Sequence, residues 1–341
     1  MDSFAKEDAE VRAEVFGEVA ARKGVAPVII EKDFWVCWAL RRVFELADRL
    51  PAPLFKGGTS LSKGYGLIER FSEDVDISLD RHALGFADER DPACAELSGK
   101  VRKGLLKELK ETADQYVGDE LLHTLNDCFL IGLGAEVFSL SVDDDEAQTL
   151  LFSYPVGERR DDATLGYVKP VVRLEFGVRS DHDPSEKIQV TPYAAEEFPD
   201  LFEAPETIVK VLAAERTFWE KATILHALAH AAVDREPGER KSRHLYDLAQ
   251  LARSDVRGRA LQNLRLLTAV ADHKNLFFRA ASARYDLAKP GTLKLIPSEE
   301  VLSALEKDYR SMAEMFFAEP EPFDDVVECL TELEAEINGL V

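Results

Sequence analysis

The chain has 341 residues, 46% of them hydrophobic and 31% charged, and its formal net charge is −22 at pH 7. These values are typical of a globular protein large enough for about two domains, and the negative charge argues against a protein that coats nucleic acid with its whole surface. The four cysteines lack the paired spacing of a zinc site, and no apolar run reaches the ~18 residues of a membrane helix. We expect a cytoplasmic protein without a membrane segment.

The first part of the sequence combines helical and strand patterns. Helices are expected over residues 3–23 and 28–50, where apolar residues recur at helical spacing. Pro51 and Pro53 close the second helix. Residues 54–79 then follow as a strand, a glycine turn, a helix and a second strand.

Further strands are expected downstream, after a helical pattern over residues 101–122. They occupy short apolar or alternating runs over residues 129–142, 149–154, 171–179, 188–193 and 208–211. After residue 213 the pattern is helical to the end of the chain. The predicted fold class is α+β, with an α+β domain over residues 1–205 and a helical domain over residues 206–341.

The stretch 55–79 is the most informative part of the sequence. Gly57 and Gly58 allow the backbone to approach a ligand without a Cβ in the way. Thr59 or Ser60 can cap the helix that follows, and the first turn of that helix offers N–H groups to a phosphate. The pattern predicts a phosphate-binding turn.

Two carboxylates follow the turn. Asp74 and Asp76 alternate with apolar residues, so both point to one face of a strand. Alternation over residues 171–179 likewise places Arg173 and Glu175 on one face. If the two strands are neighbours, Glu175 joins the pair as a third carboxylate. Three carboxylates this close repel one another unless a cation binds between them. Because Mg²⁺ prefers oxygen ligands, the pattern predicts a Mg²⁺-nucleotide site.

Two other kinds of site share parts of this pattern. An Asp-x-Asp pair also occurs in haloacid dehalogenase phosphatases and in glycosyltransferases, but the phosphatase pair needs no glycine turn ahead of it. His226 and His230 are four residues apart in a helical segment and could share a metal. No acidic residue stands where a zinc protease helix requires one, so we interpret them as packing or surface histidines.

Residues 57–79 closely resemble the signature of the AbiEii/AbiGii toxin family of nucleotidyltransferases, which share the polymerase β-like nucleotidyltransferase fold. Three later segments extend the resemblance in the order that the family shows, the last of them more loosely: Phe218-Trp-Glu-Lys-Ala-Thr-Ile-Leu-His226, Ser242-Arg-His-Leu-Tyr-Asp-Leu-Ala-Gln250 and Asp308-Tyr-Arg-Ser-Met-Ala-Glu-Met-Phe316. The resemblance implies a mixed sheet with flanking helices and a C-terminal helical domain.

The resemblance also implies roles for single residues. The turn Gly57-Gly58-Thr59-Ser60 is the phosphate-binding element, and Asp74 and Asp76 are the metal-binding, catalytic pair. Lys221 matches the functional lysine of the family and would meet a phosphate of the nucleotide. Asp247 matches the acidic residue of the last motif and would orient Lys221 or contact the substrate.

Two further candidates come from the residues themselves. Glu175 is the third metal ligand suggested by strand alternation. Lys63 flanks the turn and could either reach a phosphate or lie at the surface. The nucleotidyltransferase superfamily usually has Gly-Ser at the start of this helix. Here Thr59 takes that position with Ser60 behind it, so either hydroxyl could meet the phosphate.

By resemblance, we expect a Mg²⁺-dependent nucleotidyltransferase toxin of a toxin–antitoxin or phage abortive-infection system. It would use one or two Mg²⁺ ions and a nucleoside triphosphate donor, with RNA as acceptor, the 3′ end of tRNA first, and a cognate antitoxin as partner. Two alternatives stay open: transfer to a protein hydroxyl, which the net charge of −22 favours, and a catalytically silent nucleotide-binding protein. Convergence of the basic residues between positions 159 and 243 on one face would favour RNA.

Overall fold

The computed structural model describes residues 1–72, 74–156, 170–231 and 240–340. The chain forms two compact units. The first, here called the sheet unit, comprises Met1–Tyr65 and Phe71–Val211; the second, the helical unit, comprises Gly66–Arg70 and Leu212–Val341. Within the described residues, no helix combines the length and apolar character needed to cross a membrane.

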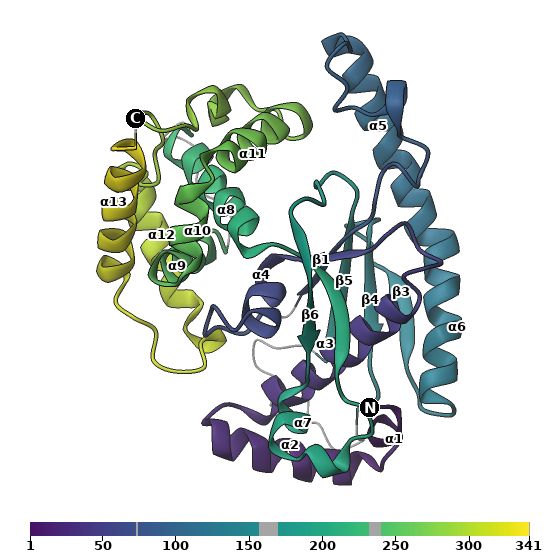
Figure 1. Cartoon of the computed structure of the whole chain (residues 1–341). Helices are drawn as coiled ribbons and strands as arrows, with labels where there is room; N and C mark the ends of the chain where they lie inside the picture. Colours follow the sequence, from purple (N-terminus) through teal and green to yellow (C-terminus); the bar gives the residue numbers. More distant parts are fainter. Residues whose placement is uncertain (73, 157–169, 232–239, 341) are drawn as a thin grey trace. The chain divides into compact units, whose positions relative to one another are not determined.

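The sheet unit is built on a seven-stranded mixed sheet with the strand order β3-β4-β5-β2-β1-β7-β6 (Figure 1). Its strands are β1 Leu54–Lys56, β2 Asp74–Ser78, β3 Ser139–Val142, β4 Thr149–Ser153, β5 Val171–Gly177, β6 Ser185–Val190 and β7 Thr207–Leu212. Strand β2 is parallel to β5 and antiparallel to β1, while β1 is parallel to β7. The predicted α+β class is confirmed, and the strands at 74–78 and 171–177 are neighbours, which was the condition for Glu175 to join the Asp pair.

Strand alternation gives the central strands one apolar and one charged face. Val75 and Ile77 of β2 pair with Leu174 and Phe176 of β5, and all four side chains are buried. The residues between them, such as Asp76, therefore lie on the opposite face. The apolar face makes the core, which leaves the charged face for chemistry.

Helices cover the apolar face. In Figure 1, α3 and α6 lie beside the sheet, and the aromatic side chains of α3 make much of the core. The Trp38 ring stacks on Phe152 of β4, with centroids 5.7 Å apart, and Phe129 of α6 meets Phe152 edge-on at 4.8 Å. The helices of this unit are α1 Asp2–Ala5, α2 Ala9–Lys23, α3 Pro27–Glu45, α4 Gly57–Thr59, the π-helix η1 Ser60–Gly64, α5 Gly99–Tyr116, the π-helix η3 Val117–Leu121, α6 Leu122–Leu133 and α7 Tyr193–Glu197.

One predicted strand was wrong. The run at 129–142 is helical up to Leu133 and becomes the strand β3 only from Ser139. Leu125 and Phe129 are four residues apart and both buried, which is the helical rather than the strand period. A short apolar run satisfies both patterns, so packing decided the outcome.

The helical unit confirms the pattern predicted after residue 213 for the residues that the structure describes. Its main helices are α8 Ala214–Ala229, α9 Ser242–Arg253, α10 Val256–Gln262, α11 Leu264–Phe277, α12 Glu299–Ser311 and α13 Phe323–Asn338. Helix α9 packs against both α8 and α13 and buries Leu245, Leu248 and Leu251 on its apolar side. This burial fixes the helix that carries Asp247.

Two residues of α6 provide a direct test of the core. Phe129 is fully buried, whereas Ile131, two positions later, is 80% exposed. We expect Phe129→Ala to lower the free energy of unfolding by about 3–5 kcal/mol, because it leaves a cavity beneath β4. Ile131→Ala should change it by less than about 0.5 kcal/mol. Urea denaturation followed by circular dichroism measures both; similar effects for the two variants would contradict this packing.

Candidate active site

The glycine turn lies directly against the first carboxylate strand. Gly57 has a φ of +77°, a conformation that L-residues with a side chain rarely adopt. A Cβ on Gly57 would stand 1.9 Å from Asp76 Oδ2 and 2.9 Å from Asp76 Cβ. Glycine is therefore required twice at this position, for its backbone conformation and for the space that Asp76 occupies.

The two hydroxyls of the turn hold it in place. Thr59 Oγ1 donates to the carbonyl oxygen of Asp74 at 2.5 Å, which ties the turn to the start of β2. Ser60 Oγ donates to the carbonyl oxygen of Gly57 at 2.8 Å. Both side chains are buried. In this arrangement the hydroxyls stabilise the turn, and their predicted contact with phosphate stays a prediction.

The carboxylates of β2 and β5 lie next to each other on the charged face. Strand register places Asp76 beside Glu175 and Asp74 beside Arg173. Burial, together with the charges of Asp76 and then Asp74, raises the pKa of Glu175 to about 7. The three carboxylates therefore interact strongly, as the sequence predicted for Glu175 from alternation alone.

Two basic side chains partly balance this negative charge. The Arg173 Nε lies 3.7 Å from Asp74 Oδ1 and 3.6 Å from Glu175 Oε1. Lys56 of β1 pairs in register with Asp76, and its Nζ is 3.6 Å from Asp76 Oδ1. Strand alternation predicted that Arg173 would share a face with Glu175, but its contacts with Asp143 and Glu146 were not predicted, because these residues come from a separate segment of the chain.

The donor chemistry of this face fits a divalent cation. Asp76 and Glu175 present oxygen atoms from neighbouring strands, and oxygen is the ligand atom that Mg²⁺ prefers; burial and the neighbouring carboxylates raise the pKa of Glu175. In the described part of the chain, no three Asp, Glu, His or Cys side chains already form a closed metal cluster.

Lys63, at the far end of the turn, is buried away from this face. Its Nζ is 3.0 Å from Asp33 Oδ1 of α3 and 3.3 Å from the centre of the Tyr193 ring. Asp33 Oδ2 also accepts the backbone N–H of Tyr193 at 2.7 Å. Lys63 thus fixes the π-helix η1 to α3 and α7, and its predicted contact with a nucleotide stays a prediction.

Lys221 and Asp247 meet inside the helical unit. Lys221 Nζ lies 2.6 Å from Asp247 Oδ2, and Arg70 binds the same carboxylate through two hydrogen bonds of 2.7 and 2.8 Å. Burial favours the neutral form of Asp247, but Arg70 and then Lys221 overcome it and hold the pKa of Asp247 far below its usual range. Burial, the largest influence on Lys221, lowers its pKa. Of the two roles predicted for Asp247, its contact with Lys221 agrees with orienting that lysine, while the contact with Arg70 was not predicted.

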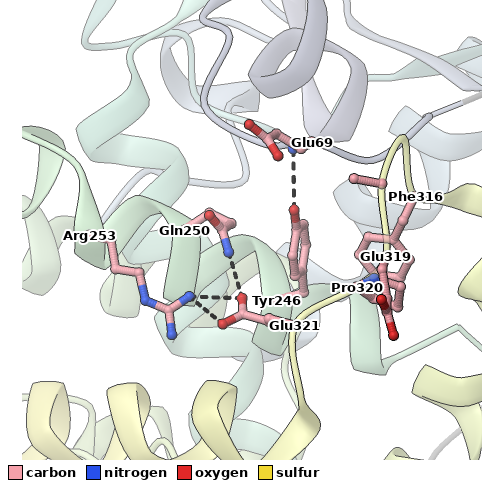
Figure 2. A pocket seen from close by; sticks show the side chains of 9 residues that line it. Glu69, Tyr246, Gln250, Arg253, Phe316, Glu319, Pro320 and Glu321 are labelled. Carbon is pink, nitrogen blue, oxygen red and sulfur yellow. Dashed lines mark hydrogen bonds and ion pairs between the residues drawn. The ribbon is translucent and has the colours of Figure 1, made fainter. Parts of the chain in front are cut away.

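A pocket of about 220 Å³ lies in the same unit, beside α9 (Figure 2). Figure 2 shows Tyr246 in its wall, where the hydroxyl accepts the backbone N–H of Glu69 at 3.2 Å. Glu321 accepts hydrogen bonds from Gln250 and Arg253, each at 2.6 Å at its shortest. Gln250 and Arg253 thus bind Glu321, and these two residues and Tyr246 are the part of the wall that belongs to α9, the helix that carries Asp247.

The two histidines have structural contacts, as the sequence interpretation expected. His226 Nε2 bonds to the carbonyl oxygen of Arg284, and its Nδ1 accepts the backbone N–H of Lys294, each at 3.0 Å. His230 Nδ1 bonds to the carbonyl oxygen of His226 at 2.9 Å. Both ring nitrogens of His226 are thus used by the backbone.

Several basic residues of the middle region are held in ion pairs, including Arg216, which contacts Glu220 at 3.4 Å. Four others lie outside the described residues: Arg159, Arg160, Lys169 and Arg235. Convergence of the whole set on one face therefore stays a prediction.

A glycine turn folded against paired carboxylates on a mixed sheet agrees with the class of enzyme predicted from the motifs, the nucleotidyltransferases. The sequence profile described as "Nucleotidyl transferase AbiEii toxin, Type IV TA system" matches residues 38–329. Because this match covers most of the chain, the protein belongs to the AbiEii family of nucleotidyltransferase toxins of type IV toxin–antitoxin systems. The resemblance drawn from the motifs is confirmed.

Comparison with solved structures gives MenT4, a nucleotidyltransferase toxin from Mycobacterium tuberculosis H37Rv, among the similar chains. The two sequences are 17% identical, the TM-score is 0.45, and the match covers 95% of this chain and 97% of that one. A search of curated proteins found no match.

Two glycines with similar positive φ angles, Gly24 and Gly57, provide a test of the turn. Gly24, with a φ of +70°, has open space around it, whereas Gly57 faces Asp76. We expect Gly24→Ala to cost about 1–2 kcal/mol of unfolding free energy from backbone strain alone. Gly57→Ala should cost clearly more and should also abolish nucleotide transfer, because Asp76 must move. Equal losses of stability in thermal denaturation would show that the close approach to Asp76 is unimportant.

The buried ion pairs of Asp247 give a second test. Asp247→Asn should lower the free energy of unfolding by about 3–5 kcal/mol, since Arg70 and Lys221 lose their shared carboxylate. The same change at exposed Asp255, which pairs with Arg259 on the surface, should cost less than about 1 kcal/mol. Equal effects at the two positions would contradict the assignment of Asp247 as the shared buried partner of Arg70 and Lys221.

The pH dependence of the Asp247 effect has a definite sign. The pKa of Asp247 is lower in the folded than in the unfolded chain, so its stabilising contribution is complete above about pH 5 and disappears on acidification through the folded-state value. Melting temperatures of wild type and Asp247→Asn should therefore approach each other as pH falls. A gap that widens in acid would contradict this assignment.

Proposed function

We propose that this protein transfers a nucleotide from a nucleoside triphosphate to an RNA acceptor, with the 3′ end of tRNA as the first candidate, in a Mg²⁺-dependent reaction. The observation that carries the proposal is the alignment of Asp74, Asp76 and Glu175 on one face of the sheet, next to the Gly57 turn. Family membership supports the nucleotide donor.

The carboxylates have the chemistry that such a reaction needs. Asp74, Asp76 and Glu175 would hold one or two Mg²⁺ ions. When bound, these ions neutralise phosphate charge and lower the pKa of an attacking hydroxyl. The protein itself mainly positions the reactants, because phosphoryl and nucleotidyl transfer need little covalent help. The Gly57 turn brings the backbone close to Asp76, which would place a triphosphate beside the metal site.

Basic side chains on the same face support a role in binding phosphates. Lys56 and Asp76 are register partners, and Phe55 is the register partner of Val211 on β7. Lys210 precedes Val211, so alternation places it on the face of Lys56, and it is exposed. Strands β1 and β7 thus each place one lysine on the face of the carboxylates, where either lysine could contact a triphosphate or an RNA backbone.

The buried groups would act indirectly. We assign Asp247 a positioning role toward Lys221, which would neutralise the phosphates of the nucleotide as the family resemblance implies. Thr59, Ser60 and Lys63 would contribute by fixing the turn, since their polar atoms contact other parts of the protein. A separately encoded antitoxin would complete the system, as type IV toxin–antitoxin membership implies.

The proposal is tested by incubating the purified protein with each of the four labelled triphosphates, Mg²⁺, total tRNA and a cell protein extract. We expect the label to appear in tRNA. Asp76→Asn should reduce transfer by at least about a hundredfold, because the metal loses a ligand, while chelation with EDTA should abolish it. Label in protein alone would instead support the alternative acceptor, which the charge of −22 favours.

Two lysine variants, one for the test and one for the control, distinguish RNA binding from a general effect of charge. Lys210→Ala should raise the KM for tRNA several-fold with little change in kcat, because the residue would contact the acceptor backbone. Lys103→Ala removes the same charge from an exposed position of α5 and should leave both constants unchanged. Transfer to neither acceptor class, or equal transfer by wild type and Asp76→Asn, would overturn the proposed function.

A further inference from the structure

Arg173 lies among four carboxylates on the charged face of the sheet. Its Nη1 is 2.6 Å from Asp143 Oδ2 and its Nη2 is 3.1 Å from Glu146 Oε2. Its Nε faces the other way, toward Asp74 and Glu175. One guanidinium therefore connects the candidate metal ligands with the loop between β3 and β4.

The contacts on the two sides differ in kind. Both contacts to the loop are hydrogen bonds, whereas the Nε distances to Asp74 and Glu175 are 3.7 and 3.6 Å, which is too long for a hydrogen bond. The loop side is thus the anchor. The metal-site side is an electrostatic contact that can be replaced without breaking a hydrogen bond.

The loop is itself built to hold the guanidinium. Asp143 Oδ1 accepts the backbone N–H groups of Asp145 and Glu146 at 2.9 and 3.1 Å, which leaves Oδ2 directed at Arg173. Glu146 Oε2 also accepts the hydroxyl of Thr149 at the start of β4. Asp143 is therefore held in place by the backbone, Glu146 adds a second contact from an exposed position, and Arg173 lies close to Asp74 and Glu175.

We propose that Arg173 is a positioning residue that serves as the built-in counter-ion of Asp74 and Glu175 and lowers the affinity of the nucleotide-free protein for a divalent metal. This inference rests on the proposed function of the same site. The metal would then be loaded efficiently only together with a triphosphate, whose oxygens supply further ligands and whose charge offsets the guanidinium. The protein would thereby avoid holding a metal without its substrate.

Coulomb's law sets the size of the effect. A divalent ion bound by Asp74 and Glu175 would lie within several ångströms of the guanidinium, since that group is under 4 Å from both carboxylates. Removing one positive charge at that range should tighten metal binding about tenfold or more, even with strong solvent screening. Lys56 stays in place beside Asp76 and keeps part of the compensation.

The test is a titration of the nucleotide-free protein with Mn²⁺, followed by the electron paramagnetic resonance signal of the free ion. We expect Arg173→Gln to bind Mn²⁺ about tenfold more tightly than wild type. Arg173→Lys keeps the charge and should stay within about threefold of wild type. Arg90→Gln removes a guanidinium that pairs with Glu108 and should have no effect.

Asp76→Asn, alone and combined with Arg173→Gln, shows whether Mn²⁺ binds at this site. In the double variant, the increase in Mn²⁺ affinity caused by Arg173→Gln should disappear. Mn²⁺ binding by Arg173→Gln that equals or is weaker than that of wild type, with an unchanged melting temperature, would overturn the inference and leave the proposed function standing. Mn²⁺ binding that is insensitive to Asp76→Asn in every variant would overturn the proposed function itself.

Discussion

The arrangement of the sheet unit depends on one electrostatic constraint: the parallel pairing of β2 with β5 places Asp76 beside Glu175 on the same face. Like charges so placed must be neutralised by a proton, by basic side chains or by a metal. The protein uses basic side chains on both sides, with Arg173 over Glu175 and Lys56 beside Asp76. The apolar residues on the opposite face fix the register, so the carboxylates cannot move apart by a strand slip.

The helical unit solves the reverse problem. There one buried carboxylate, that of Asp247, is shared by Arg70 and Lys221. Because two buried cations depend on this one carboxylate, removing it should strongly lower the stability of the protein. Both units thus gather charges of one sign, negative on the charged face of the sheet and positive around Asp247. Such clusters are typical of proteins that bind a charged substrate.

Much of this could be predicted from sequence because it depends on local pattern. Period-two alternation placed Glu175 beside the Asp pair, and the double glycine marked the turn at Gly57. The contacts of Arg70 could not be found in this way, because its partner Asp247 lies 177 positions away and a single arginine has no periodic signal. The strand predicted at 129–142 failed for a related reason: a short apolar run fits a helix or a strand until tertiary packing selects one.

We propose that Asp74, Asp76 and Glu175 form one metal site, and that Arg173 and Lys56 balance the negative charge of these carboxylates until a metal binds. Anomalous scattering from crystals grown with Mn²⁺ and a non-hydrolysable nucleoside triphosphate tests it most directly. We expect a Mn²⁺ peak ligated by Asp74 and Asp76, with Glu175 in its first coordination sphere and Arg173 displaced from Asp74. A metal peak elsewhere, with Arg173 and Lys56 still on these carboxylates, would contradict it.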